Sequence, residues 1–478
     1  MLYSAKVFRA PRAARGAPAS GPGRAGRAVV AGTRQARRSY AVFSVYPSFR
    51  SAWLGSALSM LGTRTLGVTY PLLAFWLTGS PAWTGWVVFA STVPGLLCYI
   101  PAGVLVDRLG RRRVMMWSEA GRALLVGAVC AGLLHGSLRG ADLVAVALAE
   151  GVLFVTSTVA ETALIPATVH RRDVDTALAV HETTVHAVVL AGRPLGGLLY
   201  GLGPLTPFLA NAAVFACASA AFARLPREED PRPKETFPGG IRSGLREVWE
   251  NRFLRSATVL TALANLVVQA LIVVFLSGAA STGVHPAVVG LTLAASGVGG
   301  AFGAFISPAR RRISRKIDAR AARGRWTLWL AEWLGLSRRG RSMLLVHVLT
   351  CCGALGLTVA LGQGPPVVGA ALLVIGLAGG LSNVTIRTVL SQVPEDRVAK
   401  VVSVSRLGSY GAVALGPLLA GVLVANVTAA TAVLILFGLM SAVALAAALV
   451  PVFRRALSPR LVAGNRQVSA RPGAARMR

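Results

Sequence analysis

Apolar segments long enough to cross a lipid bilayer recur along most of the chain. A membrane-spanning helix needs about 20 predominantly apolar residues, and windows of that length occur at 53–77, 83–106, 114–134, 142–165, 177–200, 205–223, 256–279, 287–307, 343–362, 366–390, 400–425 and 429–452. Hydrophobic residues form 54% of the 478 residues, and the mean hydropathy is +0.61. A soluble domain could not hide that much apolar surface in its core. The sequence predicts an all-α integral membrane protein with twelve transmembrane helices in two six-helix bundles.

The net charge of +32 follows the predicted topology. Of the 50 Lys and Arg residues, 44 lie in the two termini and in the loops after the second, fourth, sixth, eighth and tenth predicted spans. Only Arg139 lies in the alternate loops. Because basic loops stay on the cytoplasmic side, we expect both termini to be cytoplasmic and the protein to reside in the plasma membrane. The basic loops could also contact anionic lipid head groups, and nucleic-acid binding is not expected.

Composition divides the chain into bundles and connecting segments. Residues 1–50 hold ten basic and no acidic residues and predict a disordered N-terminal extension. The first bundle is expected at 51–223, a cytoplasmic linker with an amphipathic helix at 224–255, and the second bundle at 256–453. The second bundle contains a long basic loop at 308–342, and a basic cytoplasmic tail follows at 454–478.

The loop between the second and third predicted spans reads G-x-x-x-D-R-x-G-R-R from Gly103 to Arg112. This pattern resembles the signature that the major facilitator superfamily of transporters carries between its second and third helices. The resemblance implies a latch that closes the cytoplasmic side, in which the Asp107 carboxylate meets the positive N-terminus of the helix that begins near 398–401. The alternative is that the arginines serve topology alone. The latch residues would be Gly103, Asp107, Arg108, Gly110, Arg111 and Arg112.

A second pattern lies in the predicted span 177–200. The segment AGRPLGGLL resembles the Gly-Pro-rich stretch of the superfamily's drug and proton antiporters, with Arg193 inserted into it, and its motif residues are Gly192, Pro194, Gly196 and Gly197. The segments RRRVMMWSEAGRALL, ETALIPATV and FLRSATVLTALANL are similar to bacterial exporters of drugs, siderophores and secondary metabolites. This resemblance implies export of a small organic molecule.

Charged side chains inside predicted spans indicate a transport pathway, because each costs several kcal/mol unless it meets a partner or a wet cavity. Counting about 1.5 Å per residue from the predicted helix ends places Arg64, Glu150 and His186 at the same mid-membrane depth. We expect Glu150 to carry the coupled proton, with Arg64 or His186 as the partner that changes its proton affinity. The alternative is a fixed ion pair that braces the helices. Glu119 and Arg122, three residues apart, are expected to pair with each other.

The second half offers polar side chains but no acid within a predicted span. Asn265 and Gln269 lie one turn apart and are candidates for a substrate cavity, although hydrogen bonding between helices would explain them equally well. No G-x-x-x-x-G-K-[ST] loop is present, so ATP binding of that kind is excluded. The sequence contains neither a G-x-S-x-G nor an H-E-x-x-H pattern, so neither of these motifs indicates an enzyme. No cofactor and no metal site are expected.

Together these features predict a monomeric secondary transporter that binds a small-molecule substrate and protons. It would export a drug, siderophore or secondary metabolite by alternating access, in exchange for protons. One alternative is an importer or facilitator of a polar nutrient. The other is a membrane partner or sensor that keeps the fold without transporting.

Overall fold

The computed structural model describes residues 42–226, 246, 249–250, 252–320, 343–390 and 395–449. Within these ranges the first half consists of α2 (Pro47–Thr78), α3 (Pro81–Thr92), α4 (Pro94–Leu97), α5 (Tyr99–Leu109), α6 (Arg111–Leu134), α7 (Gly140–Ala167), the short η1 (Arg171–Asp173), α8 (Val174–Gly201) and α9 (Thr206–Ala223). The second half consists of α11 (Arg252–Ser281), α12 (Pro286–Arg320), α14 (Met343–Leu361), α15 (Pro365–Leu390), α16 (Glu395–Asn426) and α17 (Ala429–Leu449).

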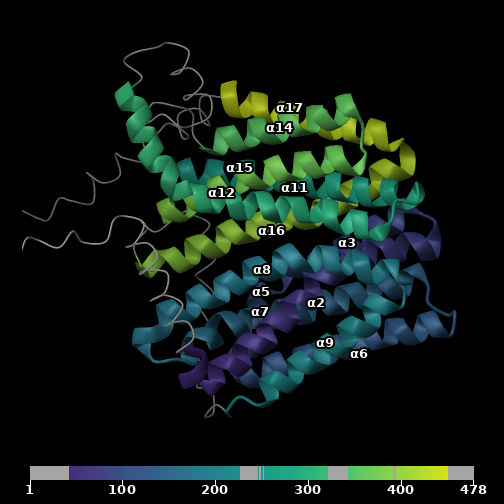
Figure 1. The fold of residues 1–478 in the computed structure, drawn as a ribbon, viewed down its shortest axis with the longest axis vertical. Helices are drawn as coiled ribbons and strands as arrows, with labels where there is room; N and C mark the ends of the chain where they lie inside the picture. Colours follow the sequence, from purple (N-terminus) through teal and green to yellow (C-terminus); the bar gives the residue numbers. More distant parts are fainter. Residues whose placement is uncertain are drawn as a thin grey trace, which may run out of the picture.

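The long helices run side by side and form two bundles (Figure 1). When α3, α4 and α5 are counted as one rod, the described residues provide six rods in each half. The purple to teal helices of the first half pack around two buried apolar clusters of their own, and the green to yellow helices of the second half pack around another. A fourth apolar cluster joins the two halves through α2, α11, α12 and α15. The all-α, two-bundle prediction is confirmed.

Eight of the described helices are long and apolar enough to cross a membrane, and the bent α3–α5 rod makes a ninth. The three remaining rods are α2, α8 and α16, which are 32, 28 and 32 residues long. At about 1.5 Å per residue each is long enough to span the apolar core of a bilayer. Each also contributes to the wall of the central cavity described below, α2 with several residues, α8 with Arg193 and α16 with Val413.

The second predicted span, at 83–106, is broken rather than continuous. α3 and α4 meet α5 at an angle of 68°. Pro94 begins α4, and Pro101 lies in the first turns of α5. Proline has no amide hydrogen for the helix ladder and its ring clashes with the preceding turn, so the rod bends where the two prolines lie close together.

Two segments are more helical than the sequence predicted. Residues 42–50 were assigned to a disordered extension, but 42–45 and 47–50 are helical, and Val42 and Phe49 are buried in an apolar cluster of the first half. α12 continues to Arg320 and so includes the start of the expected loop 308–342. This stretch is rich in Arg, Lys and Ala, which all favour helix, so its positive charge does not end α12. The rest of that loop, residues 1–41, the C-terminal tail and most of the linker 224–255 lie outside the described residues.

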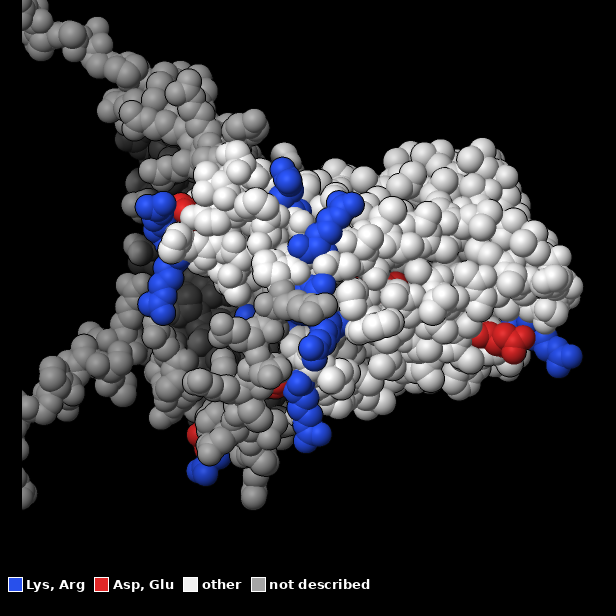
Figure 2. Space-filling model, turned by 90° about the horizontal axis from the view of Figure 1, so that it is seen from below, with Lys and Arg blue, Asp and Glu red and all other residues white. Residues whose placement is uncertain are grey.

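The two ends of the bundles differ in charge. One end, here called the Arg-rich end, carries the exposed Arg50, Arg108, Arg171 and Arg224. Arg139 lies at the opposite end, where its backbone N–H donates to Asp142 at 2.9 Å. In Figure 2 the basic side chains gather over the left part and middle of the visible face, and the right-hand tip carries one mixed patch.

A hydrogen bond ties the starts of two rods together at the Arg-rich end. The Tyr46 hydroxyl donates to Asp173 Oδ2 at 2.7 Å, and so links the residue before α2 to the residue before α8. This bond is the largest cause that lowers the pKa of the Asp173 carboxyl below its ordinary value, since it stabilises the ionised form. Asp173 therefore stays charged among the arginines of this end.

Glycines allow the backbones of neighbouring rods to touch. A Cβ on Gly376 or Gly380 of α15 would collide with the backbone of α12, at Ser296 and Gly300 respectively. Small residues of this kind are how helices approach closely in lipid, where no hydrophobic force drives them together.

The glycine contacts yield the first prediction. Gly376→Ala adds a methyl group against the Ser296 carbonyl and should destabilise the protein by about 1–3 kcal/mol through overpacking. The measurement is the apparent melting temperature of the purified protein in detergent. Gly438→Ala on α17 is the matched control, since a Cβ there meets nothing within 4 Å. Equal melting temperatures for the two variants would contradict the assigned packing.

Candidate transport cavity and charge cluster

A cavity of about 260 Å³ lies between the two halves. Its walls come from α2, α3, α4, α5, α7 and α8 of the first half and from α11, α12 and α16 of the second. Apolar side chains such as Leu66, Phe154 and Ile272 line part of it. Its polar lining consists of Thr63, Arg64, Tyr70, Ser91, Thr92, Tyr99, Glu150, Arg193 and Gln269.

Arg122 is buried behind this cavity and binds two carboxylates. Its Nε and Nη2 donate to Glu150 Oε1 at 2.9 and 2.5 Å, and its Nη1 donates to Glu119 at 3.0 and 3.1 Å. The Arg122 and Glu119 side chains are fully buried, and 5% of the Glu150 side chain is exposed. Glu150 is the one of these three charged residues that lines the cavity, so it is the charged group through which the cluster meets the cavity.

Hydroxyl groups and aromatic rings complete this cluster. Ser59 accepts from Arg122 Nη1 at 2.8 Å and donates to Glu119 at 2.8 Å, and Ser157 donates to Glu119 at 2.9 Å. Thr63 accepts from Arg122 Nη2 at 2.6 Å. The guanidinium also lies over the Phe215 ring, with its carbon 3.9 Å from the ring centroid, which is a cation–π distance.

Helical spacing explains why these groups converge. Glu119 and Arg122 are three residues apart on α6, and Ser59 and Thr63 are four apart on α2, so each pair shares a helix face. Glu150 and Ser157 are two turns apart on α7 and face the same way. Two carboxylates share one guanidinium, so the cluster with both acids ionised carries one excess negative charge.

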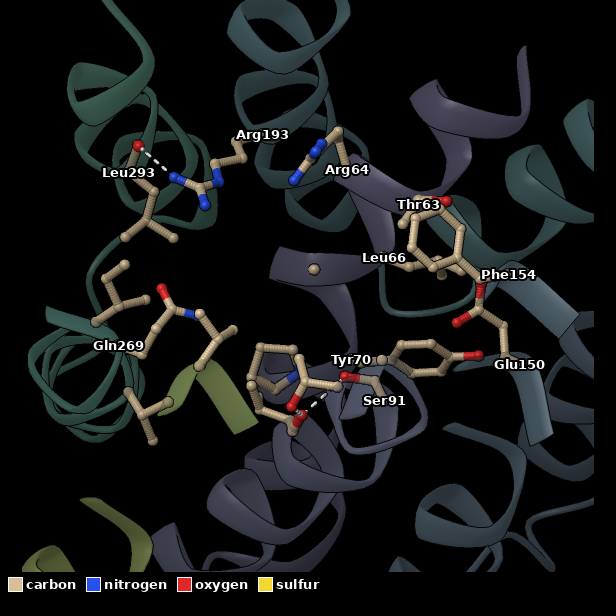
Figure 3. A pocket seen from close by; sticks show the side chains of 18 of the residues that line it. Thr63, Arg64, Leu66, Tyr70, Ser91, Glu150, Phe154, Arg193, Gln269 and Leu293 are labelled. Atoms are coloured by element: carbon tan, nitrogen blue, oxygen red, sulfur yellow. Dashed lines mark hydrogen bonds between the residues drawn. The ribbon is translucent and has the colours of Figure 1, made fainter. Parts of the chain in front are cut away.

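Two more arginines lie on the cavity wall, away from this cluster. Arg64 follows Thr63 on α2, and Arg193 belongs to α8. Figure 3 shows Arg64 and Arg193 on one side of the cavity and Glu150 on another. Arg193 Nη1 donates to the Leu293 carbonyl and to Ser296 Oγ, both at 2.9 Å. Since these acceptors belong to α12, Arg193 links the first half to the second.

The structure places some of the proposed proton-coupling residues together. Glu150 and Arg64 both line the cavity, as the depth argument predicts. The ion-pair partner of Glu150 is Arg122, which the sequence analysis paired with Glu119 alone. His186 is exposed on α8 and is not among the residues that line the cavity. Spacing along α6 gave the Glu119–Arg122 contact, but only the packing of α6 on α7 brings Glu150 to the same guanidinium.

One of the two candidate substrate residues reaches the cavity. Gln269 on α11 lines it, whereas Asn265, one turn earlier, is half-buried and is not among the lining residues. Arg193, which lines the cavity, was noted in the sequence as a charged residue within the span 177–200 and as an insertion in the Gly-Pro motif, but it was not assigned to the cavity. Its charge inside an apolar span indicated a pathway residue, but its position relative to the second half depends on the packing of α8 on α12.

The Gly-Pro motif packs α8 between α2 and α12. A Cβ on Gly192 would lie 2.5 Å from Arg64 Cβ, and one on Gly196 would lie 2.7 Å from the Thr65 carbonyl oxygen. Gly197 faces the other way, and its Cβ would collide with the Pro286 carbonyl oxygen of α12. Pro194 approaches the same helix at Gly290. These close contacts hold Arg193 between the two halves.

The proposed latch motif lies at the Arg-rich end, at the turn between α5 and α6. Gly110 occupies that turn with a φ of 82°, a conformation that favours glycine. Asp107 and Arg108 are exposed, and a Cβ on Gly103 would meet nothing within 4 Å, so close helix packing does not require this glycine here. Arg112 Nη2 donates to the Ala223 carbonyl at 2.7 Å. Arg111 is half-buried, and the expected partner side chains near 398–401 lie outside the described residues.

Apolar packing closes the cavity toward the end opposite the Arg-rich end. Val68 and Leu72 near the far end of α2 are buried against Phe275 and Leu276 of α11 and Leu293 of α12. These contacts join the two halves beyond the cavity, on the side that carries Arg139.

The charge cluster yields the second prediction. Arg122→Met leaves two buried carboxylates without their guanidinium, which should cost about 3–5 kcal/mol. The yield of monodisperse protein and its apparent melting temperature in detergent should both fall. The triple variant Glu119→Gln, Arg122→Met, Glu150→Gln removes all three charges and should recover most of the loss. Arg113→Met, at an exposed position, is the control. An Arg122→Met variant as stable as the wild type would contradict the assignment of Arg122 as the partner of two buried, ionised carboxylates.

Comparison with known proteins identifies the family. The sequence model of the Major Facilitator Superfamily matches residues 52–392. The multidrug efflux pump Tap of Mycolicibacterium fortuitum is 28% identical over 249 residues, which cover 50% of this chain and 61% of that pump. Tap of Mycobacterium tuberculosis H37Rv is 30% identical over 40% of this chain and 48% of its own. The match to the uncharacterized MFS-type transporter y4rN of Sinorhizobium fredii is 30% identical over 56% of this chain and 68% of that protein.

Solved structures share the fold at low sequence identity. The nucleoside transporter NupG aligns with a TM-score of 0.62 at 13% identity, over 84% of this chain and 98% of its own. A bacterial homolog of the human lysosomal transporter Spinster, in an inward-facing and unoccupied conformation, aligns with a TM-score of 0.60 at 16% identity, over 92% and 99%. With two bundles around a polar cavity and a family match over most of its length, this chain belongs to the Major Facilitator Superfamily of membrane transporters.

Proposed function

We propose that this protein is a secondary active transporter that exports a small organic molecule from the cytoplasm in exchange for protons. The observation that carries the proposal is the Glu150 carboxylate, which lines the cavity while bonded to the buried Arg122. The similarity to pumps named for multidrug efflux supports export of a drug-like compound or a secondary metabolite. By the positive-inside rule the Arg-rich end faces the cytoplasm, so both termini are cytoplasmic. The similarity to efflux pumps favours the plasma membrane as the site of export.

The apolar closure opposite the Arg-rich end fits an inward-facing transporter. In alternating access the two halves rock around a fixed central site, so that one side is sealed while the other opens. Val68, Leu72, Phe275 and Leu276 seal the extracellular side in this arrangement. In the outward-facing arrangement this seal opens, and the motif from Gly103 to Arg112 latches the cytoplasmic side.

The charge count of the cluster supports proton binding at Glu150. Glu119 and Glu150 share one guanidinium, and an excess negative charge is expensive in a low-dielectric site. A proton on Glu150 would make the cluster neutral and leave Arg122 bound to Glu119. Protonation would also weaken the Arg122–Glu150 bond, which joins α6 to α7. The position of Glu150 in the cavity wall would therefore depend on whether the proton is bound. Substrate and proton can then compete for one arrangement of the halves.

The third prediction concerns proton-driven uptake. Energised inverted membrane vesicles that contain the protein should accumulate at least one compound from a panel of dyes, antibiotics and siderophores, and an uncoupler should abolish the accumulation. Glu150→Gln cannot exchange a proton at this position. Uphill accumulation should therefore fall at least about tenfold, as expected for the loss of an essential proton carrier, while downhill movement of the same compound persists.

The matched control is Asp142→Asn, which neutralises a carboxylate of the same helix α7 outside the cavity. It should accumulate substrate as the wild type does. Proton-dependent accumulation that survives in Glu150→Gln at the wild-type level would refute the assignment of Glu150 as the proton carrier. Accumulation that resists the uncoupler would refute proton exchange altogether.

A further inference from the structure

We infer that the cavity selects organic anions and that Arg64 and Arg193 bind the anionic group of the substrate. The inference rests on the proposed function in that it names the substrate class of the same cavity. It is carried by the number, position and geometry of the charged side chains that line this space.

The first observation is the balance of charge on the cavity wall. Among the described residues that line it, two are arginines, Arg64 and Arg193, and one is a carboxylate, Glu150. That carboxylate is already bonded to Arg122, which stands behind the wall. The two arginines therefore outweigh the one excess negative charge of the cluster, and a narrow, low-dielectric space with a net charge concentrates ligands of the opposite sign.

The second observation is that the two guanidinium groups face the same part of the cavity. Figure 3 shows them beside each other, apart from Glu150 and Tyr70. They are close enough for their charges to act on each other, and an oxyanion between them would relieve that repulsion. Guanidinium groups suit planar oxyanions because their N–H groups donate in pairs with matching geometry. A carboxylate fits this chemistry, and an ammonium group does not.

The third observation is that Arg193 already joins the two halves. Its Nη1 binds the Leu293 carbonyl and Ser296 Oγ on α12, while Arg64 belongs to α2 on the other side of the seam. An anion held by both arginines would sit where the halves meet. A ligand shifts a conformational equilibrium only through contacts that differ between the two states, and the Arg193 bonds to α12, beside which the anion would lie, are contacts that a movement of the halves would change.

The remaining lining residues indicate what the uncharged part of the substrate is like. Leu66, Phe154, Ile272 and Leu276 offer apolar and aromatic surface, and Gln269 offers one amide. The volume of about 260 Å³ is close to the lower limit of small-molecule pockets, about 300–1,000 Å³. We therefore assign as substrate a compact aromatic or aliphatic body that carries one carboxylate or a similar oxyanion.

Binding of three matched probes tests the inference. Tritiated naphthalene-2-carboxylate, naphthalene-2-carboxamide and 2-naphthylmethylammonium share one aromatic body and differ in charge. Their affinities for the purified full-length protein in detergent are measured by scintillation proximity, without a membrane or a proton gradient. The wild type should bind the carboxylate at least about tenfold more tightly than the amide or the ammonium, as expected for a charge-assisted bidentate contact.

Two single variants locate the preference. Arg64→Gln and Arg193→Gln should each weaken carboxylate binding about tenfold or more while changing amide binding little. Arg64→Lys keeps the charge and should restore part of the affinity. Arg193→Gln retains an amide donor for the Leu293 carbonyl, which protects the fold, and a melting curve of each variant checks it. Arg113→Gln, at an exposed position on α6, is the control and should bind all probes as the wild type does.

The outcomes separate this inference from the proposed function. Equal affinity for carboxylate and amide, no measurable binding of the carboxylate, or a preference that survives in the Arg64→Gln, Arg193→Gln double variant would overturn anion selection. Carboxylate binding that depends on both arginines, in a protein that shows no proton-driven accumulation, would uphold the anion site and reject the coupled export. Proton-driven uptake restricted to cationic compounds would uphold the coupled export and reject the anion site.

Discussion

The placement of one buried guanidinium between two carboxylates fixes how three helices of the first half pack against one another. Arg122 has no exposed side-chain surface and binds Glu119 of its own helix and Glu150 of the next. An ion taken out of water is costly unless its hydrogen bonds are satisfied. Here Ser59, Thr63 and Ser157 supply hydroxyl groups and Phe215 supplies a ring face. α2, α6 and α7 must therefore keep their relative rotation for the cluster to survive.

The cavity between the two halves is lined by Glu150 of this cluster and by two further charged residues, which are held in place in a different way. Arg64 and Arg193 are positioned by close backbone contacts, because Gly192 and Gly196 bring α8 against α2 and Gly197 brings it against α12. The acid-containing cluster lies within the first half, whereas Arg193 reaches across to the second. In the proposed cycle, the cluster responds to protons and the two arginines to substrate. Both face one volume of about 260 Å³, so each can influence the other without a long path between them.

Much of the fold was predictable from hydropathy, since long apolar spans in lipid have few alternatives to helices. The expected spans 366–390 and 429–452 fall on α15 and α17. The bend in α3–α5 was missed because its prolines lie inside a segment that is apolar throughout. The helical stretches at 42–45 and 47–50 were missed because Val42 and Phe49 are too few to register as a span and are buried only by tertiary packing. Of the three residues that depth counting placed at one level, Glu150 and Arg64 line the cavity and His186 does not. Depth counting gives no helix rotation, so it could not make Arg122 the partner of Glu150.

The most direct test of the central claim is whether the Glu150 carboxyl itself takes up a proton. Infrared difference spectra of the full-length protein in lipid, recorded as the medium is made more acidic, report the carbonyl stretch of protonated carboxyl groups. The account predicts a protonated-carboxyl band that appears in the wild type and in Asp142→Asn and is lost in Glu150→Gln. Identical spectra for the wild type and Glu150→Gln would contradict it, because the coupled proton would then bind elsewhere.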